Sequence, residues 1–397
     1  MMSQRFSIAR FPRIEFGAGT IAGLPGIAVK FGRRALLVTG AASFQQSSRW
    51  GALLQGLQQA GMQWEHTIVS GEPSPGLVDA AVEQFRDLQA EVVIAIGGGS
   101  VLDAGKAIAG LLRTGDSVMD YLEGVGPEKP YTGPAVPFIA APTTAGTGSE
   151  ATRNAVLSIQ GEHGFKKSFR DERLVPEYAV VDPDLLSTCP PAQIAANGMD
   201  ALTQLMESFV STRASDMTDA LALDGIRAAR DSLMPLYENP AGVPGARAGM
   251  AYAALLSGIT LAQTGLGSVH GLASPLGAFF PIPHGVVCGT LVAAATRVNI
   301  AAMQAREPQN PALDKYARLA CLLCNTRYSD ALQAYDALID FLETWTQQLD
   351  IPRLGRFGVK ENDFARIVTN SRGSSMKTNP VVLTDDEVTA ILQQRLR

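Results

Sequence analysis

The pattern of the chain changes once, at a pair of prolines, and this change constrains the fold more than any other feature. Before Pro190-Pro191, short apolar runs such as 34–39 alternate with segments of helical periodicity. Strands that are apolar throughout are typical of a parallel sheet covered on both faces. After the prolines only long helical periods follow. The sequence therefore predicts a Rossmann-like α/β domain with a parallel sheet over residues 1–187, and an all-α domain over 188–397.

The individual elements follow from the same periodicities. An alternating stretch around Pro12, residues 6–16, indicates an edge strand or hairpin. An exposed strand edge invites pairing with a second chain, so we expect a homodimer. Strands are expected at 34–39, 64–69, 91–96, 136–140 and 178–181, with helices at 50–60 and 77–88 and a buried helix at 248–266.

Composition excludes several classes of partner. A chain of 397 residues is too long for one ordinary core, which favours two domains. With a net charge of -5 and no Lys/Arg-rich run, neither nucleic acid nor a membrane is expected as a partner. The first ten residues lack an apolar signal core, and four cysteines are too few for a disulfide framework. The expected location is the cytoplasm, with Cys321 and Cys324 as buried small hydrophobes.

A run of three glycines follows the strand at 91–96 and opens a helix. Glycines allow close backbone approach to a phosphate, and the start of a helix offers free N–H groups and a positive dipole end. Ser100 suits the N-cap. A plain tight turn is the alternative. The candidates for cofactor binding here are Gly97, Gly98, Gly99, Ser100 and Asp103.

A second loop, 141–150, follows the next strand and is rich in hydroxyl groups and backbone donors. Such a loop suits a pyrophosphate or a ribose, although it could also be a turn with internal Ser/Thr hydrogen bonds. Two such loops at strand ends favour ligand binding, because open α/β sheets place ligands there. The candidates in this loop are Thr143, Thr144 and Thr147.

Two of the four histidines, His270 and His284, lie in a stretch without any other ionisable group. A buried imidazole needs a partner, which can be a metal or an ordinary hydrogen bond. Upstream, Asp200 and Gln204 are four residues apart and share one face of a predicted helix. Together these four side chains would form a metal site with an open position, as in catalytic rather than structural sites. A helix cap or surface carboxylate remains the alternative for Asp200.

These segments together resemble the iron-containing (group III) alcohol dehydrogenase family, and more distantly glycerol dehydrogenase and dehydroquinate synthase. The resemblance covers the whole chain in the right order. It implies a dehydroquinate synthase-like fold, a nicotinamide-dependent reaction on an alcohol or aldehyde, and a divalent metal between the domains, iron or else zinc. The matching segments are 97–106, 142–150, 181–184, 198–202 and 270–285.

Carried over residue by residue, the resemblance makes Asp200, His270 and His284 metal ligands. The family's fourth ligand is a histidine, where this chain has Gln204. An amide oxygen is a weaker donor, so metal identity and occupancy are open. A further family histidine, assigned to the proton path, is Ser274 here, and that role passes to its hydroxyl or to solvent.

The resemblance also carries over a cofactor set, and it departs from the NAD-preferring pattern at the end of the first strand. Family members that prefer NAD have an aspartate there, whereas this chain has Gly40 followed shortly by Ser43. Without that carboxylate a 2′-phosphate is not repelled, so both NAD(H) and NADP(H) are expected. The family's cofactor positions match Gly98, Gly99, Ser100, Thr143, Thr144, Asn154 and Lys167.

The leading hypothesis is a metal-dependent NAD(P)-linked alcohol dehydrogenase or aldehyde reductase that acts on a small alcohol or aldehyde. A lyase or cyclase of the dehydroquinate synthase type is the alternative, but it needs several Lys/Arg in the cleft, and the helical half supplies few near the two histidines. A nucleotide-binding relative that has lost its metal is a third reading. Phe279 and Phe280 are candidates for an apolar substrate pocket, and the loop 374–380 is expected to have a surface or hinge role.

Overall fold

A six-stranded parallel sheet organises the first half of the chain. The structure, a computed structural model, describes residues 5–397. The strand order is β1-β8-β5-β4-β2-β3, and every neighbouring pair is parallel. The strands are β1 (Arg13–Phe16), β2 (Arg34–Gly40), β3 (Gln63–Val69), β4 (Val92–Gly97), β5 (Phe138–Pro142) and β8 (Tyr178–Val181).

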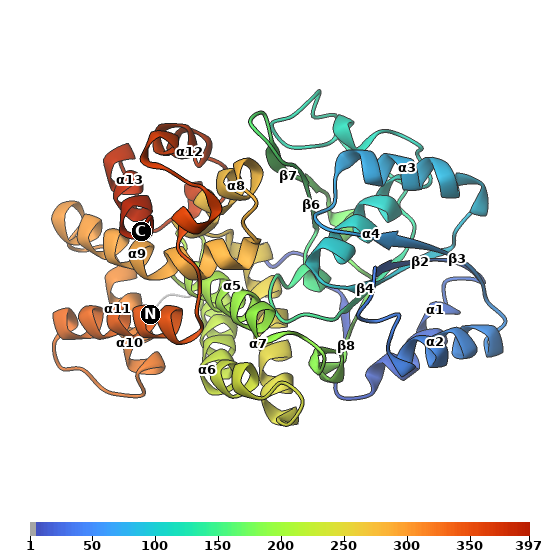
Figure 1. The fold of residues 1–397 in the computed structure, drawn as a ribbon, viewed down its shortest axis with the longest axis horizontal. Helices are drawn as coiled ribbons and strands as arrows, with labels where there is room; N and C mark the ends of the chain where they lie inside the picture. The colour runs from blue at the N-terminus through green and yellow to red at the C-terminus, as the bar shows by residue number, and fades with distance from the viewer. Residues whose placement is uncertain (1–4) are drawn as a thin grey trace.

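Helices cover both faces of this sheet (Figure 1), which explains why the central strands are apolar on both sides. On one face, α3 (Pro75–Phe85) and α4 (Gly99–Leu111) pack with β4 and β5 into one core. On the other face, α1 (Leu24–Ala28) and α2 (Ser48–Gln59) form a second core. The five strands expected inside the sheet and the predicted Rossmann-like architecture are confirmed.

The expectation for residues 6–16 was only partly right. A strand forms at Arg13–Phe16 alone, and it lies at the edge of the sheet, as predicted. It is not part of a hairpin, because it pairs in parallel with β8, far away in the sequence.

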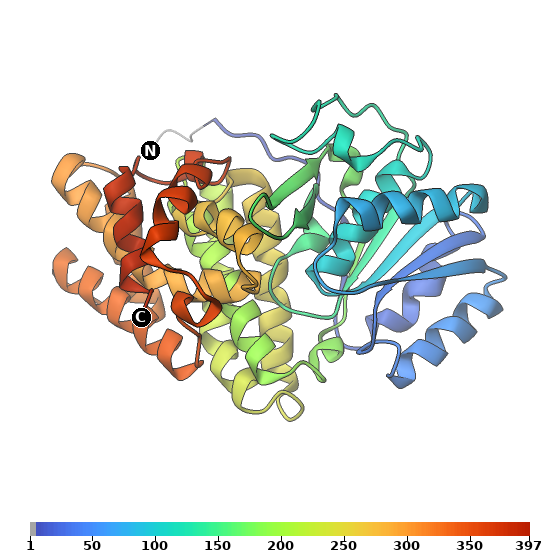
Figure 2. The same cartoon turned by 45° about the horizontal axis from the view of Figure 1, so that its top comes forward.

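One hairpin was missed. β6 (Asn154–Ile159) and β7 (Phe165–Arg170) form a separate antiparallel pair, which lies beside α8 (Ser268–Phe279) of the helical half (Figure 2). Its second strand, Phe-Lys-Lys-Ser-Phe-Arg, does not alternate as a half-buried strand should, and this hid it from the periodicity argument.

From Pro191 onward the described chain is helical, as predicted. The buried helix predicted at 248–266 forms as α7 (Pro244–Thr264), which ends two residues before the predicted end. α9 is long and apolar enough to cross a bilayer by length and composition, but 83% of its apolar window is buried, as in a core helix. The boundary at 187/188 stays a prediction; it falls between the last strand and α5. The helices, besides α8, are α5 (Pro191–Val210), α6 (Asp216–Glu238), α7 (Pro244–Thr264), α9 (His284–Arg306), α10 (Ala312–Leu323), α11 (Ala331–Gln348), α12 (Phe364–Asn370) and α13 (Asp385–Gln394).

Candidate active site

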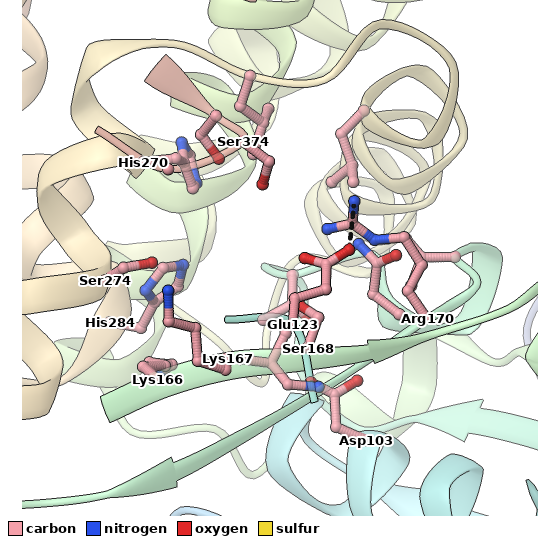
Figure 3. A pocket seen from close by; sticks show the side chains of 18 of the residues that line it. Asp103, Glu123, Lys166, Lys167, Ser168, Arg170, His270, Ser274, His284 and Ser374 are labelled. Atoms are coloured by element: carbon pink, nitrogen blue, oxygen red, sulfur yellow. Dashed lines mark hydrogen bonds and ion pairs between the residues drawn. The ribbon is translucent and has the colours of Figure 1, made fainter. Parts of the chain in front are cut away.

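A cavity of about 530 Å³ lies where the α/β half meets the helical half. Its walls come from the start of α4, the β6–β7 hairpin, α8 and the segment 370–377. Figure 3 shows His270, Ser274 and His284 on one side of it, and Arg170 with Glu123 on the other. Segments far apart in the sequence therefore share one pocket, as expected for a cofactor and a substrate that meet between two domains.

Three of the predicted metal ligands converge beside this cavity, two of them on its wall. Asp200 lies on α5, His270 on α8, and His284 is the first residue of α9. Oδ1 of Asp200 is 3.2 Å from Nε2 of His270 and 3.8 Å from Nε2 of His284. Asp200 is only 1% exposed, so the helix-cap and surface-carboxylate reading does not apply to it.

Glu207 holds His270 in place, and the sequence reasoning did not assign it a role. One of its carboxylate oxygens accepts from Nδ1 of His270 at 2.6 Å, and the other accepts from the backbone N–H of Val269 at 2.7 Å. This arrangement directs Nε2 of His270 toward Asp200. Glu207 follows Asp200 by seven residues on α5, and that helical spacing was the signal that could have identified it.

The electrostatics of the cluster follow from burial and close opposite charge. Burial alone would raise the pKa of Asp200, but the two histidines beside the carboxylate lower it to about 2. Burial lowers the pKa of His284 to about 4, against the attraction of Asp200. Asp200 is thus an anion and His284 a neutral imidazole at neutral pH, as metal ligands require. Burial alone would lower the pKa of His270, but the neighbouring Cys288, Glu207 and Asp200 raise it, so a metal would displace a proton from that ring.

Gln204 also reaches the cluster, but both ends of its side-chain amide are hydrogen-bonded to protein groups. Nε2 donates to Oδ1 of Asp200 at 3.1 Å, and Oε1 accepts from the hydroxyl of Ser257 at 2.7 Å. A further side chain that the sequence reasoning missed, Cys288, lies among the same groups. It follows His284 by four residues on α9, so the same-face rule applied to Asp200 and Gln204 makes it one of several candidates on that helix.

The residues present fit a divalent metal. The ligand atoms of Asp200, His270, His284 and Cys288 all lie within 4.8 Å of one another. Nε2 of His284 faces the cluster, 3.8 Å from Oδ1 of Asp200 and 3.9 Å from Sγ of Cys288. A buried carboxylate with two imidazoles is a donor set that suits iron or zinc.

The two glycine- and threonine-rich loops leave adjacent strands at the same level. Gly97 at the end of β4 is paired with Pro142 at the end of β5, and the N–H of Thr143 donates to the carbonyl of Gly97 at 2.9 Å. The loops touch closely, since a Cβ on Gly99 would lie 2.7 Å from Thr147. Any larger residue at position 99 would therefore push the side chain of Thr147 aside.

Ser100 is not the N-cap of α4, contrary to the expectation. The helix begins at Gly99, the N-cap is Gly98, and no side chain caps it. Ser100 is already inside the first turn. The first N–H groups of α4 are thus left free beside the cavity, where an anionic group can accept from them.

A buried lysine, Lys106, ties the two loops together. Its ammonium group donates to the carbonyl oxygens of Ser149 and Asn154 and to the hydroxyls of Ser149 and Thr152, at 2.7–3.0 Å. Asp103 accepts from the Ser149 hydroxyl and from the N–H of Val156. The structure therefore gives Asp103 a contact that orders the second loop, in addition to its place on the cavity wall.

The structure brings ten of the predicted site residues to the cavity wall and leaves others away from it. Gly40 lies at the end of β2, where its carbonyl accepts from the side-chain amide of Gln45 at 2.8 Å. Those on the wall are Gly99, Ser100, Asp103, Thr147, Asn154, Lys167, Gln204, His270, Ser274 and His284. Those not on it are Gly40, Ser43, Gly97, Gly98, Thr143, Thr144 and Asp200.

The structure contradicts one expectation about the surroundings and adds to two others. Phe279 and Phe280 do not line the cavity, whose wall is rich in polar side chains. Ser374, Ser375 and Lys377 of the loop 374–380 line the cavity, which is compatible with the surface or hinge role expected for this loop. Basic residues are present near the histidines, because the unexpected hairpin brings Lys166, which pairs with Glu72 at 2.9 Å, and Arg170, which pairs with Glu123 at 3.2 Å.

Comparison with known proteins identifies the family. Residues 12–183 match the family described as iron-containing alcohol dehydrogenase, and residues 194–396 match the C-terminal region of the same family. This chain belongs to the iron-containing alcohol dehydrogenases. The resemblance carried by the sequence motifs is confirmed.

Individual relatives agree with the assignment to the iron-containing alcohol dehydrogenases. The chain is 35% identical over 327 residues to alcohol dehydrogenase 4 of Saccharomyces cerevisiae, covering 81% of each chain. It is 30% identical to an NADPH-dependent butanol dehydrogenase of Clostridium saccharobutylicum, covering 98% of this chain and 97% of the relative. A solved 1,3-propanediol oxidoreductase superposes with a TM-score of 0.88 at 30% identity, covering 99% of this chain and 100% of the other.

This iron-containing alcohol dehydrogenase is an oxidoreductase that acts on alcohols with a nicotinamide cofactor, as the sequence hypothesis stated. Its family uses NAD(P) and Fe²⁺, and this chain has the buried donor cluster that such a metal needs. Its substrate is an alcohol or aldehyde.

Proposed function

We propose that Asp200, His270 and His284 bind the metal, and that the start of α4 binds the phosphates of NAD(P)(H). The observation that carries this proposal is the shared cavity, whose wall includes Gly99 and Ser100 at one place and His270 and His284 at another. A dinucleotide held at α4 would thus lie in the same pocket as an alcohol held at the metal. Metal analysis of the purified protein, together with an alcohol and aldehyde panel assayed with both cofactors, tests the assignment.

The residues of this chain prepare the site for hydride transfer. When bound, the metal supplies Lewis acidity toward the substrate oxygen and the nicotinamide carries the hydride. Glu207 orients the imidazole of His270, and Asp200 supplies a buried negative charge. Ser274, one turn after His270 on the cavity wall, has a hydroxyl that can accept and donate a proton, and we assign it to the proton path.

The polar wall indicates the kind of alcohol that enters. Lys166 and Arg170 face the cavity as members of ion pairs with Glu72 and Glu123, so their charges are largely balanced. A small alcohol or aldehyde with a further polar group can exchange hydrogen bonds with these pairs, whereas a long apolar chain would bury them without partners. We therefore propose a small, polar substrate.

Replacing Gly40 by aspartate is expected to shift the preference of the enzyme toward NAD(H). We propose that the wild type uses both cofactors with a modest preference for NADP(H), because no carboxylate at the end of β2 repels a 2′-phosphate. A Cβ at Gly40 would meet only Val101, at 3.6 Å, which is an ordinary van der Waals contact. The NAD/NADP ratio of kcat/KM should rise roughly ten- to hundredfold.

The matched control for this change is Gly40→Asn, which adds similar volume without charge and should leave the ratio within a few-fold of the wild type. An unchanged ratio in Gly40→Asp would show that the end of β2 does not contact the adenosine ribose.

We propose that the protein is a homodimer that pairs through the β1 edge, and light scattering at micromolar concentration should give twice the chain mass. β1 lies at the end of the sheet, and Phe6, Phe11 and Phe16 on or before it are 50%, 40% and 39% exposed. An open strand edge flanked by exposed aromatic side chains favours pairing with a second chain. Phe11→Glu should shift the protein toward the monomer, whereas Val382→Glu, at an exposed position on the C-terminal part, should not. A monomeric wild type would contradict the proposal.

We also propose a cytoplasmic location. All four cysteines, Cys189, Cys288, Cys321 and Cys324, are free thiols. Free thiols are typical of the reducing cytoplasm. Cys321 and Cys324 are half-buried rather than fully buried as expected, and they form no disulfide although only two residues separate them.

A further inference from the structure

Cys288 is the one side chain of the metal cluster that neither the family resemblance nor the proposed function uses. It lies on α9 one turn after His284 and is fully buried. Its Sγ is 3.5 Å from Nε2 of His270 and 3.9 Å from Nε2 of His284. The thiol therefore faces the same point in space as the two imidazoles and the Asp200 carboxylate.

The separations between these atoms are those of ligands around one ion. With metal–nitrogen and metal–oxygen bonds near 2.0–2.1 Å and a metal–sulfur bond near 2.3 Å, tetrahedral donors stand about 3.3 to 3.6 Å apart. Nε2 of His270 is 3.2 Å from Oδ1 of Asp200 and 3.5 Å from Sγ of Cys288. Nε2 of His284 is 3.8 Å from the same Asp200 oxygen and 3.9 Å from the same sulfur. The remaining pairs of donor atoms lie within 4.8 Å of one another, so shifts of about one ångström or less would bring all four donors to one metal.

Gln204, which stands where the family has a histidine ligand, is not arranged as a donor. Its amide oxygen accepts from the Ser257 hydroxyl, and the group turned toward Asp200 is the NH₂. An amide NH₂ has no lone pair available for a metal. Its contact holds Asp200 in position and leaves the fourth donor site to another residue.

The charge of a divalent metal ion also favours Cys288 over Gln204 as the fourth ligand. A divalent ion in a pocket this buried needs anionic partners, because solvent does not compensate its charge. Among the four side chains whose ligand atoms converge, Asp200 is the only carboxylate. A thiolate would supply the second negative charge, which a neutral amide cannot.

We propose that Cys288 binds the metal as a thiolate and, together with Asp200, His270 and His284, completes a one-sulfur donor set in place of Gln204. This inference rests on the proposed metal site. On binding, the S–H bond breaks, a sulfur–metal bond forms, and the proton passes to solvent without any redox change. Because thiolate is a soft donor, the site should favour Zn²⁺ over Fe²⁺ more strongly than an all-nitrogen-and-oxygen set does.

X-ray absorption spectroscopy of the full-length protein loaded with Zn²⁺ tests the proposal directly. The wild type should show one sulfur at about 2.3 Å from the metal. After removal of zinc by a chelator and loading with Co²⁺, it should also show a near-ultraviolet thiolate-to-cobalt charge-transfer band. Both signals should be absent from Cys288→Ser and present in the matched control Cys321→Ser, whose thiol lies on α10.

Affinity measurements give a second, independent readout. Cys288→Ser should weaken Zn²⁺ binding at least roughly 10–100-fold, the scale seen when even the partners of metal ligands are removed. It should weaken Fe²⁺ binding less. Gln204→Leu should keep the sulfur signal and the metal stoichiometry. Circular dichroism of each variant in chelator checks that the fold is retained. The X-ray absorption and cobalt spectra of the wild type test the sulfur ligand even if a variant fails to fold.

The outcomes separate this inference from the proposed function. One bound metal per chain with only nitrogen and oxygen neighbours would overturn the role of Cys288 and leave the metal site standing. Loss of metal in Gln204→Leu but not in Cys288→Ser would likewise overturn it and make the amide the fourth donor. A wild type that binds no zinc or cobalt would overturn both.

Discussion

His270→Ala is expected to abolish both metal binding and turnover while the protein stays folded. The substitution removes a donor whose Nε2 is 3.2 Å from Asp200, and it leaves the Asp200 and Glu207 carboxylates without their shared partner. Metal content should fall from one ion per chain to near zero. kcat/KM should fall roughly 10³-fold or more, since a Lewis acid contributes several kcal/mol of charge stabilisation.

His163→Ala is the matched control, because His163 is exposed in the turn between β6 and β7 and does not line the cavity. It should retain wild-type metal content and turnover. Metal analysis, steady-state kinetics and thermal melting in excess chelator are compared for the two variants and the wild type. Wild-type turnover of His270→Ala in the presence of chelator would show that the site has been assigned wrongly.

Lys106→Met is expected to lower the free energy of unfolding by about 3 to 5 kcal/mol, the scale for breaking a buried charged pair. Lys106 is fully buried, and burial lowers its pKa to about 8. Its ammonium lies 3.8 Å from Asp103 and donates to four oxygens in the segment 149–154. Methionine fills the space but leaves those oxygens without a donor, so the second cofactor loop should loosen and KM for the cofactor should rise.

A surface lysine provides the comparison for this effect. Lys129 pairs with Asp120 at 2.9 Å, but its side chain is 56% exposed, so Lys129→Met should cost less than about 1 kcal/mol. Denaturant titrations of both variants measure the difference. The double variant Lys106→Met/Asp103→Asn should be less destabilised than the sum of the two single changes, since it leaves no unpaired buried charge. Equal stabilities of Lys106→Met and the wild type would contradict the structural role.

The parts of the fold that the sequence predicted are those set by local periodicity. Residues 92–96 are apolar at every position, and such a run must be buried on both faces of a sheet. The change at Pro190-Pro191 marked the transition to helices, since proline ends one element and can start the next. The β6–β7 hairpin was not predicted because the side chains of its second strand do not alternate between buried and exposed. Contacts with segments distant in the sequence decide which of these side chains are buried.

For the site, the sequence by itself determined the donor types and their local spacing. Asp200 and Gln204 on one helical face, and two histidines in an uncharged stretch, already indicated a metal, and the three glycines indicated a phosphate. Glu207 and Cys288 also lie at helical spacing from Asp200 and His284. On each helix, however, several residues have that spacing, and no local feature selects among them.

Only the tertiary structure decided which of these groups meet. The packing of α5, α8 and α9 brings Asp200, His270, His284 and Cys288 to one point, although they are up to 88 positions apart in the chain. The same packing turns the Gln204 amide toward Ser257, and the hairpin adds Lys166 and Arg170 to the cavity. Coordination and charge balance depend on distances of a few ångströms between distant segments, and such distances are fixed by the packing of the whole chain rather than by any local pattern.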